Sequence, residues 1–329
     1  MAGFVFRSKK GKDIEVPVPP APLADTHGHL TCFRTLDVAD ALAHAALAGL
    51  RLLVVPIDIV DDFGERWRTA GDLLAWLDTQ VERAHTSLDD TAGEGLEPPT
   101  FNGWGVPELL DNVHIVAGAL PYGADCLDEA ALTCLGDLLA SPRCVGVGEI
   151  GLDFGPHNKL GADVQERAFR HQLRFAHERQ LPVELHLRDG EDDTAAHDLA
   201  IRVLREEGVP ERGCDLHCFT QSLEVMAPFV ELGCHIAFGG AVTFRRSDDI
   251  RSAACACPKN LLLSETDSPY MAPVPLRGWE CEPAMVAFSA ALLADVRKAT
   301  LDAPREETYR ALWENACTLF GLSPMCAAG

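Results

Sequence analysis

The feature that most constrains the fold of this chain is a regular alternation of short apolar or β-branched runs with amphipathic, helix-like segments. The eight apolar runs lie at residues 23–27, 51–58, 114–121, 144–153, 182–188, 214–219, 234–241 and 261–267. Helical patterns lie near 37–49, 66–86, 126–140, 162–180, 193–208, 221–232, 247–257, 283–298 and 305–320. Alternation of this kind predicts an α/β fold with a parallel sheet, most simply a closed (β/α)8 TIM-type barrel. An open doubly wound sheet is the alternative, but no Gly-rich phosphate loop follows the first run.

Three segments fall outside this plan. Residues 1–22 read as a short N-terminal extension, a hairpin followed by a Pro-rich connection, and residues 323–329 as a C-terminal tail. The barrel itself is expected over residues 23–322. Within it, residues 59–113 form an insertion between the second and third strands, a helix followed by a Gly-, Pro- and acid-rich loop. That loop is long enough to be either a lid or solvated decoration.

Composition narrows the class of protein. No run of 18 or more uncharged apolar residues and no leader-like N-terminus is present, so we expect a cytoplasmic protein without membrane contact. The twelve cysteines include no CxxC pair and are expected to be free thiols. A formal charge of −22 disfavours tight, nonspecific binding of nucleic acid along its length. We expect a monomer and infer no required protein partner.

Ligand-type side chains occur where the predicted strands end. His27 ends the first run and His29 lies two residues beyond it, and on an extended strand residues i and i+2 point the same way. Glu149, His186, His217 and Asp267 lie on the fourth, fifth, sixth and eighth runs. In a (β/α)8 barrel the carboxyl ends of the strands surround one mouth, so these six side chains would converge there. Each alone could be an ordinary polar group, but together they predict a site for divalent transition metals.

The order and content of the motifs resemble the TatD family of metal-dependent deoxyribonucleases, within the amidohydrolase-like superfamily. The matching stretches run in family order: DTHGHL, VGVGEIGLDF, LPVELHLRD, LHCFTQS, FGGAVTF, LSETDSPYMAPVPLRG and ENACTLFGL. The resemblance implies two divalent ions (Zn, Mn or Mg). His27, His29, Glu149 and Asp267 would hold one, and Glu149, His186 and His217 the other. Many superfamily members that act on rings and amides carry a modified lysine on strand four, where this chain has Glu149 and no lysine.

The implied chemistry is hydrolysis by a metal-activated water, with Glu149 bridging the ions and Asp267 accepting the proton of the water. Asp153 and Glu265 are expected to hold the imidazole N–H groups, although Glu265 could instead pair with a basic group. Arg188 and Arg277 are the candidate phosphate-binding residues, unless neighbouring acids neutralise them.

Four positions depart from the family pattern. Gly28 replaces the usual cysteine, Gln221 a glycine, Cys281 an asparagine and Glu184 an aliphatic residue. Glu184 is either a partner of a ligand or a buried carboxylate whose partner the sequence does not reveal. These departures bear on the substrate more than on the metal centre.

The sequence therefore supports cleavage of phosphodiester bonds in DNA, at single-stranded ends, as the leading function. Hydrolysis of a small phosphodiester, ester, lactone or amide on the same barrel is the alternative. A role without catalysis is a third possibility, against which the full set of six ligand-type residues argues.

Overall fold

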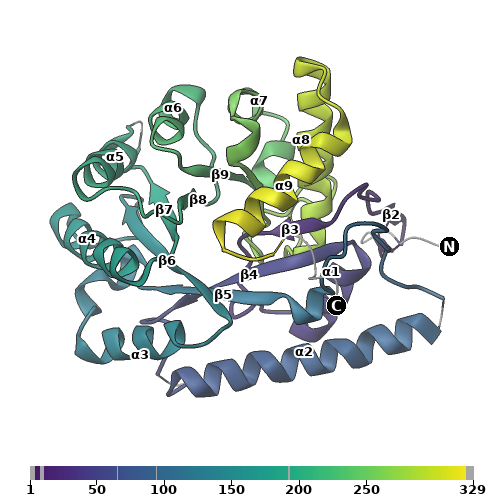
Figure 1. Ribbon diagram of the computed structural model, residues 1–329, viewed down its shortest axis with the longest axis horizontal. Helices are drawn as coiled ribbons and strands as arrows, with labels where there is room; N and C mark the ends of the chain where they lie inside the picture. The colour runs from purple at the N-terminus through teal and green to yellow at the C-terminus, as the bar shows by residue number, and fades with distance from the viewer. Residues whose placement is uncertain (1–3, 8–10, 65, 94, 192, 324–329) are drawn as a thin grey trace.

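The computed structural model describes residues 4–7, 11–64, 66–93, 95–191 and 193–323. The fold is the predicted barrel: a single sheet of eight strands in the order β10-β9-β8-β7-β6-β5-β4-β3, with every hydrogen-bonded pair parallel (Figure 1). The strands are β3 (Leu23–Asp25), β4 (Leu50–Asp58), β5 (Val113–Gly118), β6 (Cys144–Asp153), β7 (Val183–Arg188), β8 (Cys214–Leu216), β9 (His235–Phe238) and β10 (Leu262–Ser264).

Backbone contacts join the first and last strands of the sheet. The Thr26 amide donates to the Ser264 carbonyl over 3.1 Å, and the Asp267 amide donates to the His27 carbonyl over 2.9 Å. Since His27 and Asp267 are both predicted ligands, the bonds that close the ring also bring the two ends of the constellation together. The open-sheet alternative is therefore wrong.

Helices cover the outside of the sheet, as the alternating pattern predicted (Figure 1). They are α1 (Val38–Leu47), α2 (Ala70–Gly93), α3 (Glu129–Leu139), α4 (Ala162–Arg179), α5 (Ala195–Glu207), α6 (Leu223–Glu231), α7 (Asp248–Ala256), α8 (Val286–Leu301) and α9 (Arg305–Leu319). Short 3-10 turns lie at Leu109–Asp111, Pro121–Cys126, Gly240–Thr243, Lys259–Leu261 and Pro283–Met285. Within the described residues, no helix is long and apolar enough to cross a membrane.

The strongest start signal among these helices is a capping aspartate. The Asp37 carboxylate accepts hydrogen bonds from the Ala39 and Asp40 amides at the start of α1, and Asp128 does the same for α3. Each cap satisfies backbone donors that the first turn of a helix leaves free, which is why these helices begin where they do.

Apolar residues fill the amino-terminal half of the barrel interior. A cluster formed by Ala24, Leu52, Val54, Val116, Ala237 and Leu263 from the strands packs against Trp313, Ala316, Leu319 and Phe320 of α9. Because α9 lies across this end, the interior below the polar layer is closed to water. In Figure 1, α9 crosses in front of β3 and β4.

The loop that ends the insertion packs against the same closed end, although Asp61 and Asp62 at the start of the insertion lie at the opposite mouth. The Arg51 guanidinium, at the start of β4, donates to the Pro99 carbonyl and pairs with Glu108. Trp104 packs against the apolar cluster and lies under the Arg310 guanidinium, 4.4 Å from the ring centre. The loop therefore covers the amino-terminal end of the barrel, and the lid interpretation is wrong.

At the N-terminus, β1 (Val5–Arg7) pairs with β2 (Asp13–Glu15) in an antiparallel hairpin. Phe6 packs beside Phe288 of α8, with ring centres 6.2 Å apart, which ties the hairpin to the barrel. The expected tail lies outside the described residues from residue 324 onward. All the cysteines that the structure describes are free.

Candidate metal centre

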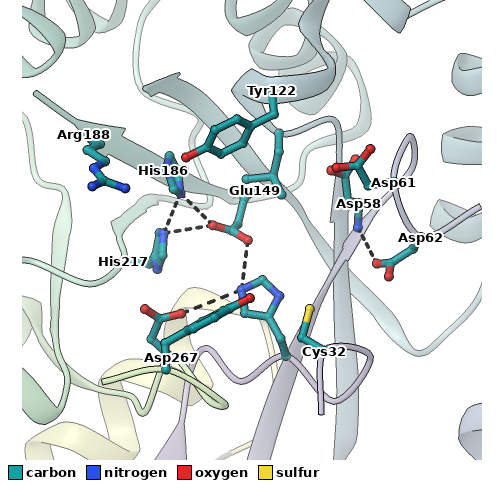
Figure 2. Close-up of a pocket in the computed structure, with 13 residues that line it drawn as sticks. Cys32, Asp58, Asp61, Asp62, Tyr122, Glu149, His186, Arg188, His217 and Asp267 are labelled. Atoms are coloured by element: carbon teal, nitrogen blue, oxygen red, sulfur yellow. Dashed lines mark hydrogen bonds and ion pairs between the residues drawn. The ribbon is translucent and has the colours of Figure 1, made fainter. Parts of the chain in front are cut away.

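The six predicted ligands converge at the mouth formed by the carboxyl ends of the strands. They line one cavity of about 420 Å³, except for His27, which is fully buried beneath it (Figure 2). The ligand-type atoms form two groups, and the atoms inside each group lie within 4.8 Å of one another. One group is His27, Glu149 and His217, and the other is His27, His29 and Asp267. The sequence prediction that distant segments meet here is borne out by this geometry.

Glu149 lies between two sets of imidazoles, and each of its carboxylate oxygens faces one of them. Oε1 is 3.7 Å from His27 Nε2 and 3.4 Å from His29 Nε2. Oε2 is 2.9 Å from His217 Nε2 and 3.0 Å from His186 Nδ1. The side chain is 2 % exposed, so a charged carboxylate here needs these neighbours.

The ring nitrogen atoms within each set lie within hydrogen-bonding distance of each other. His27 Nε2 is 3.0 Å from His29 Nε2, and His217 Nε2 is 3.3 Å from His186 Nδ1. Two imidazoles that aim ring nitrogens at each other gain at most one hydrogen bond, whereas both lone pairs can serve a shared cation. Nitrogen and carboxylate donors in this arrangement fit zinc, manganese or a similar divalent ion.

Asp267 completes the set near His27 and His29. Its Oδ1 lies 3.8 Å from the Nε2 atoms of both histidines, and its side chain is 13 % exposed, against 2 % for Glu149. The residue has φ of 55°, in the left-handed region, where aspartate is tolerated more readily than bulkier residues. Asp267 is thus the ligand-set carboxylate that reaches furthest into the cavity.

The histidines and carboxylates of the cluster shift one another's pKa values. Burial lowers the pKa of His29, but Glu149, Cys32 and Asp267 outweigh it and raise the pKa to about 10. The pKa of His186 likewise rises to about 9, because Asp153 and Glu149 outweigh its burial. Burial acts on Glu149 in the opposite sense, yet the surrounding histidines hold the pKa of that carboxyl well below its ordinary value. These shifts favour protonated imidazoles at His29 and His186 beside an ionised Glu149, whereas burial and the nearby His217 hold the pKa of His27 well below its ordinary value.

Asp153 occupies the position predicted for it. Its Oδ2 lies 3.1 Å from His186 Nε2, the ring nitrogen opposite the one that faces Glu149. The Tyr122 hydroxyl donates to the same oxygen, a contact that the sequence did not reveal because Tyr122 follows a different strand.

Glu265 requires a correction. Its Oε1 accepts a 2.5 Å hydrogen bond from the Cys218 backbone amide, so it holds the loop that follows His217 and contacts no imidazole N–H or basic group in the part of the chain described. Glu265 follows the end of β10, and its carboxylate meets the turned backbone at Cys218, whose φ is 49°.

Glu184, which the sequence left unexplained, lies beside His27. Its Oε1 is 2.9 Å from His27 Nδ1, and the two side chains are 1 % and 0 % exposed. Burial and then Asp215 raise the pKa of this carboxyl well above its ordinary value.

The two predicted phosphate-binding arginines separate. Arg188 lines the catalytic cavity and extends beside His186 (Figure 2). Arg277 lies apart from it: its guanidinium stacks over the Phe244 ring at 4.4 Å and does not line that cavity. Sequence proximity to a motif could not show which way the side chain turns.

The remaining departures have local explanations. A Cβ at Gly28 would lie 2.9 Å from Ser268 Oγ, so glycine suits the close approach of the two segments here. Gln221 lines a neighbouring groove that also contains Arg188, and Cys281 is fully buried. Gly151 is required more strictly: its φ is 145°, and a Cβ would lie 2.2 Å from the His186 carbonyl.

Further residues of the cavity escaped the sequence prediction. Asp58 ends β4, and Asp61 and Asp62 follow it; all three line the cavity, as do Cys32 and Tyr270. Burial, with Asp61 and Asp62 adding to it, raises the pKa of Asp58 to about 7. The rule that active-site residues follow barrel strands could have identified Asp58.

Comparison with known proteins agrees with this geometry. The family described as TatD related DNase matches residues 24–321. The uncharacterized metal-dependent hydrolase YabD of Bacillus subtilis is 31 % identical over 249 residues, covering 75 % of this chain and 93 % of that protein. YcfH of Escherichia coli K12, also an uncharacterized metal-dependent hydrolase, is 38 % identical over 212 residues, covering 64 % and 74 %. Among solved structures, the TatD homologue YJJV of Escherichia coli superposes with a TM-score of 0.69 and 26 % identity, covering 92 % of this chain and all of that one.

Proposed function

This chain belongs to the TatD family of metal-dependent hydrolases, and on that premise we propose that it hydrolyses phosphodiester bonds at single-stranded ends of DNA. We further propose that it does so with two divalent ions held by the six-residue centre.

The observation that carries the proposal is the position of Glu149. One carboxylate whose two oxygens face separate sets of ligands, His27 with His29 and His186 with His217, has the form of a bridge between two cation sites. Divalent cations bound there would polarise phosphoryl oxygens and lower the pKa of an attacking water. A pair of such sites suits the displacement of one phosphate oxygen by another.

The protein side chains have distinct roles in this proposal. Asp267 accepts the proton of the attacking water, because its carboxylate is the most exposed of the ligand set. Arg188, on the cavity wall beside His186, holds a non-bridging phosphate oxygen through charge-assisted hydrogen bonds. Asp153 keeps His186 in its orientation.

The dimensions of the cavity favour an end over an internal duplex segment. A volume of about 420 Å³ lies within the range of pockets that hold one small molecule, which accommodates one terminal nucleotide. A formal charge of −22 also disfavours binding along the length of a duplex, because it repels a polyanion.

A reconstituted nuclease assay tests this proposal. The metal-free protein is loaded with Zn²⁺, Mn²⁺ or Mg²⁺ and given single-stranded, double-stranded and circular DNA labelled at one end. We expect stepwise release of nucleotides from single-stranded ends and no cleavage of circles. Absence of DNA hydrolysis with every metal would contradict the proposal.

A second candidate, hydrolysis of a small ester, lactone or amide, is favoured by the acidic wall of the cavity. Asp58, Asp61 and Asp62 line the side formed by β4 and the segment after it, and they repel a polyanion. The same assay with an aryl phosphodiester, a carboxylic ester and a lactone separates the candidates. Turnover of the carboxylic ester or the lactone, without turnover of DNA, would support the second candidate.

A further inference from the structure

A buried carboxyl group outside the metal-ligand set, that of Glu184, contacts the predicted ligand His27. Glu184 lies on β7, two residues before His186, and so projects from the same strand face toward the barrel interior. Its carboxylate oxygen lies 2.9 Å from His27 Nδ1, and both side chains are shut off from water. His27 is the one hydrogen-bond partner of the Glu184 side chain among the described residues, and no lysine or arginine contacts it there.

The contact selects which nitrogen of His27 is available. When Glu184 is ionised, His27 donates its Nδ1 proton to the carboxylate and keeps the lone pair on Nε2, whereas the neutral acid, which burial favours, would itself donate to Nδ1. Nε2 is the atom that faces His29 Nε2 at 3.0 Å and Asp267 Oδ1 at 3.8 Å. A cation at Nε2 favours the same tautomer, so the carboxylate and the cation support each other.

The other imidazoles of the centre show that this support is selective. His186 is held through its second nitrogen by Asp153, but His217 Nδ1 is buried without a hydrogen-bond partner. Each of the two sets that face Glu149 therefore contains one histidine fixed by a carboxylate from the barrel wall and one that is not.

We propose that Glu184 is a positioning residue that fixes the orientation and tautomer of His27 and thereby raises the metal affinity of the centre. This inference rests on the proposed metal centre and extends it to a residue outside the ligand set. It requires no particular substrate.

The surroundings of Glu184 argue against a purely structural role. The Oε2 atom of Glu184 has no hydrogen-bond partner. In the strand register Glu184 lies opposite Asp215, whose two carboxyl oxygens also have no hydrogen-bond partner. Two buried carboxyl groups without a basic neighbour destabilise a fold. Removal of Glu184 should therefore leave the metal-free barrel at least as stable, whereas removal of a structural contact would destabilise it.

Three variants separate the possibilities. Glu184→Leu removes the acceptor at nearly constant volume. Glu184→Gln removes the charge but keeps a carbonyl oxygen that accepts the Nδ1 proton. Asp215→Asn, the matched control, converts the buried carboxyl group opposite Glu184 on the neighbouring strand into an amide, at a side chain that makes no hydrogen bond to His27 among the described residues.

Metal binding is measured by titrating the metal-free proteins with Co²⁺, followed by visible absorption and calorimetry, and thermal unfolding is recorded without metal. We expect Glu184→Leu to weaken Co²⁺ binding about 10- to 100-fold and to change the ligand-field spectrum, without a lower unfolding temperature. Glu184→Gln and Asp215→Asn should bind within about threefold of the unmodified protein and retain its spectrum.

Equal weakening by all three variants would overturn the proposal, because it would reduce the role of Glu184 to its charge. Unchanged binding by Glu184→Leu, or a protein that binds no divalent metal, would also overturn it. Failure of the proposed function looks different: the unmodified protein would bind Co²⁺ and lose affinity in Glu184→Leu, yet would hydrolyse no phosphodiester.

Discussion

The two ends of the barrel are built from the same strands but have opposite chemistry. Along β4, Leu52 and Val54 join the apolar cluster at the amino-terminal end, whereas Asp58 lines the catalytic cavity. On the last strand, Leu263 belongs to that cluster, and Asp267 follows only four residues later. The comparison teaches that one end can be optimised for packing while the other accumulates charge, because side chains at the two ends do not contact each other.

The largest effect should follow Glu149→Ala at the polar end. Loss of the central carboxylate removes contacts to both sets of imidazoles, so we expect kcat/KM to fall by about 10³-fold, which corresponds to about 4 kcal/mol. Hydrolysis rates and circular dichroism measure the loss and the fold. Glu178→Ala, an exposed acid on α4, is the control and should behave like the unmodified protein. Comparable turnover by Glu149→Ala and Glu178→Ala would contradict the assignment of the chemistry to the polar end of the barrel.

Trp313→Ala, at the apolar end, should lower the stability of the fold and leave the activity of the folded protein nearly unchanged. Trp313, on α9, is fully buried in the cluster against the strands, and truncation of such a side chain costs about 3–5 kcal/mol of unfolding free energy. Urea unfolding of the metal-free protein measures this cost. Activity per folded molecule should stay within about twofold, and a selective loss of activity at unchanged stability would show that the two ends are coupled.

Metal binding should strengthen as pH rises. In the metal-free centre the pKa of His29 is raised to about 10 and that of His186 to about 9, so both are protonated near pH 7 and must release protons to a bound cation. Below pH 9, affinity should rise about tenfold per pH unit for each proton released. Calorimetry in buffers of different ionisation enthalpy counts the protons. Affinity that does not change between pH 6 and 8 would contradict the assignment.

The smallest effects should distinguish the two arginines. Arg188→Ala should raise KM for a phosphodiester about tenfold, because about 1.5 kcal/mol of charge-assisted hydrogen bonding is lost. Arg277→Ala should change KM less than twofold, since its guanidinium rests on Phe244. Steady-state kinetics on one substrate decides this, and equal effects would show that the cavity extends to Arg277.

The sequence predicted the fold well because each strand and helix carries its own periodicity. The apolar run 144–153 recurs as β6 with the same bounds, whereas the other predicted strands and the helices differ at their ends. The metal centre was predictable for a related reason: the ligands follow strands, and a closed barrel gathers strand ends. The contacts of Glu265 and Arg277 could not be predicted, because each has a partner, the Cys218 amide and the Phe244 ring, that is distant in sequence.

The sequence alone determined the barrel, the family and the six convergent ligand-type residues, since these depend on local periodicity and on motifs. Tertiary structure decided that Glu184 meets His27, that the long loop closes the amino-terminal end, and that three aspartates line the cavity. The physical reason is that a contact between residues separated by many positions depends on strand register and side-chain direction, and a hydrophobic pattern fixes neither for an individual polar group.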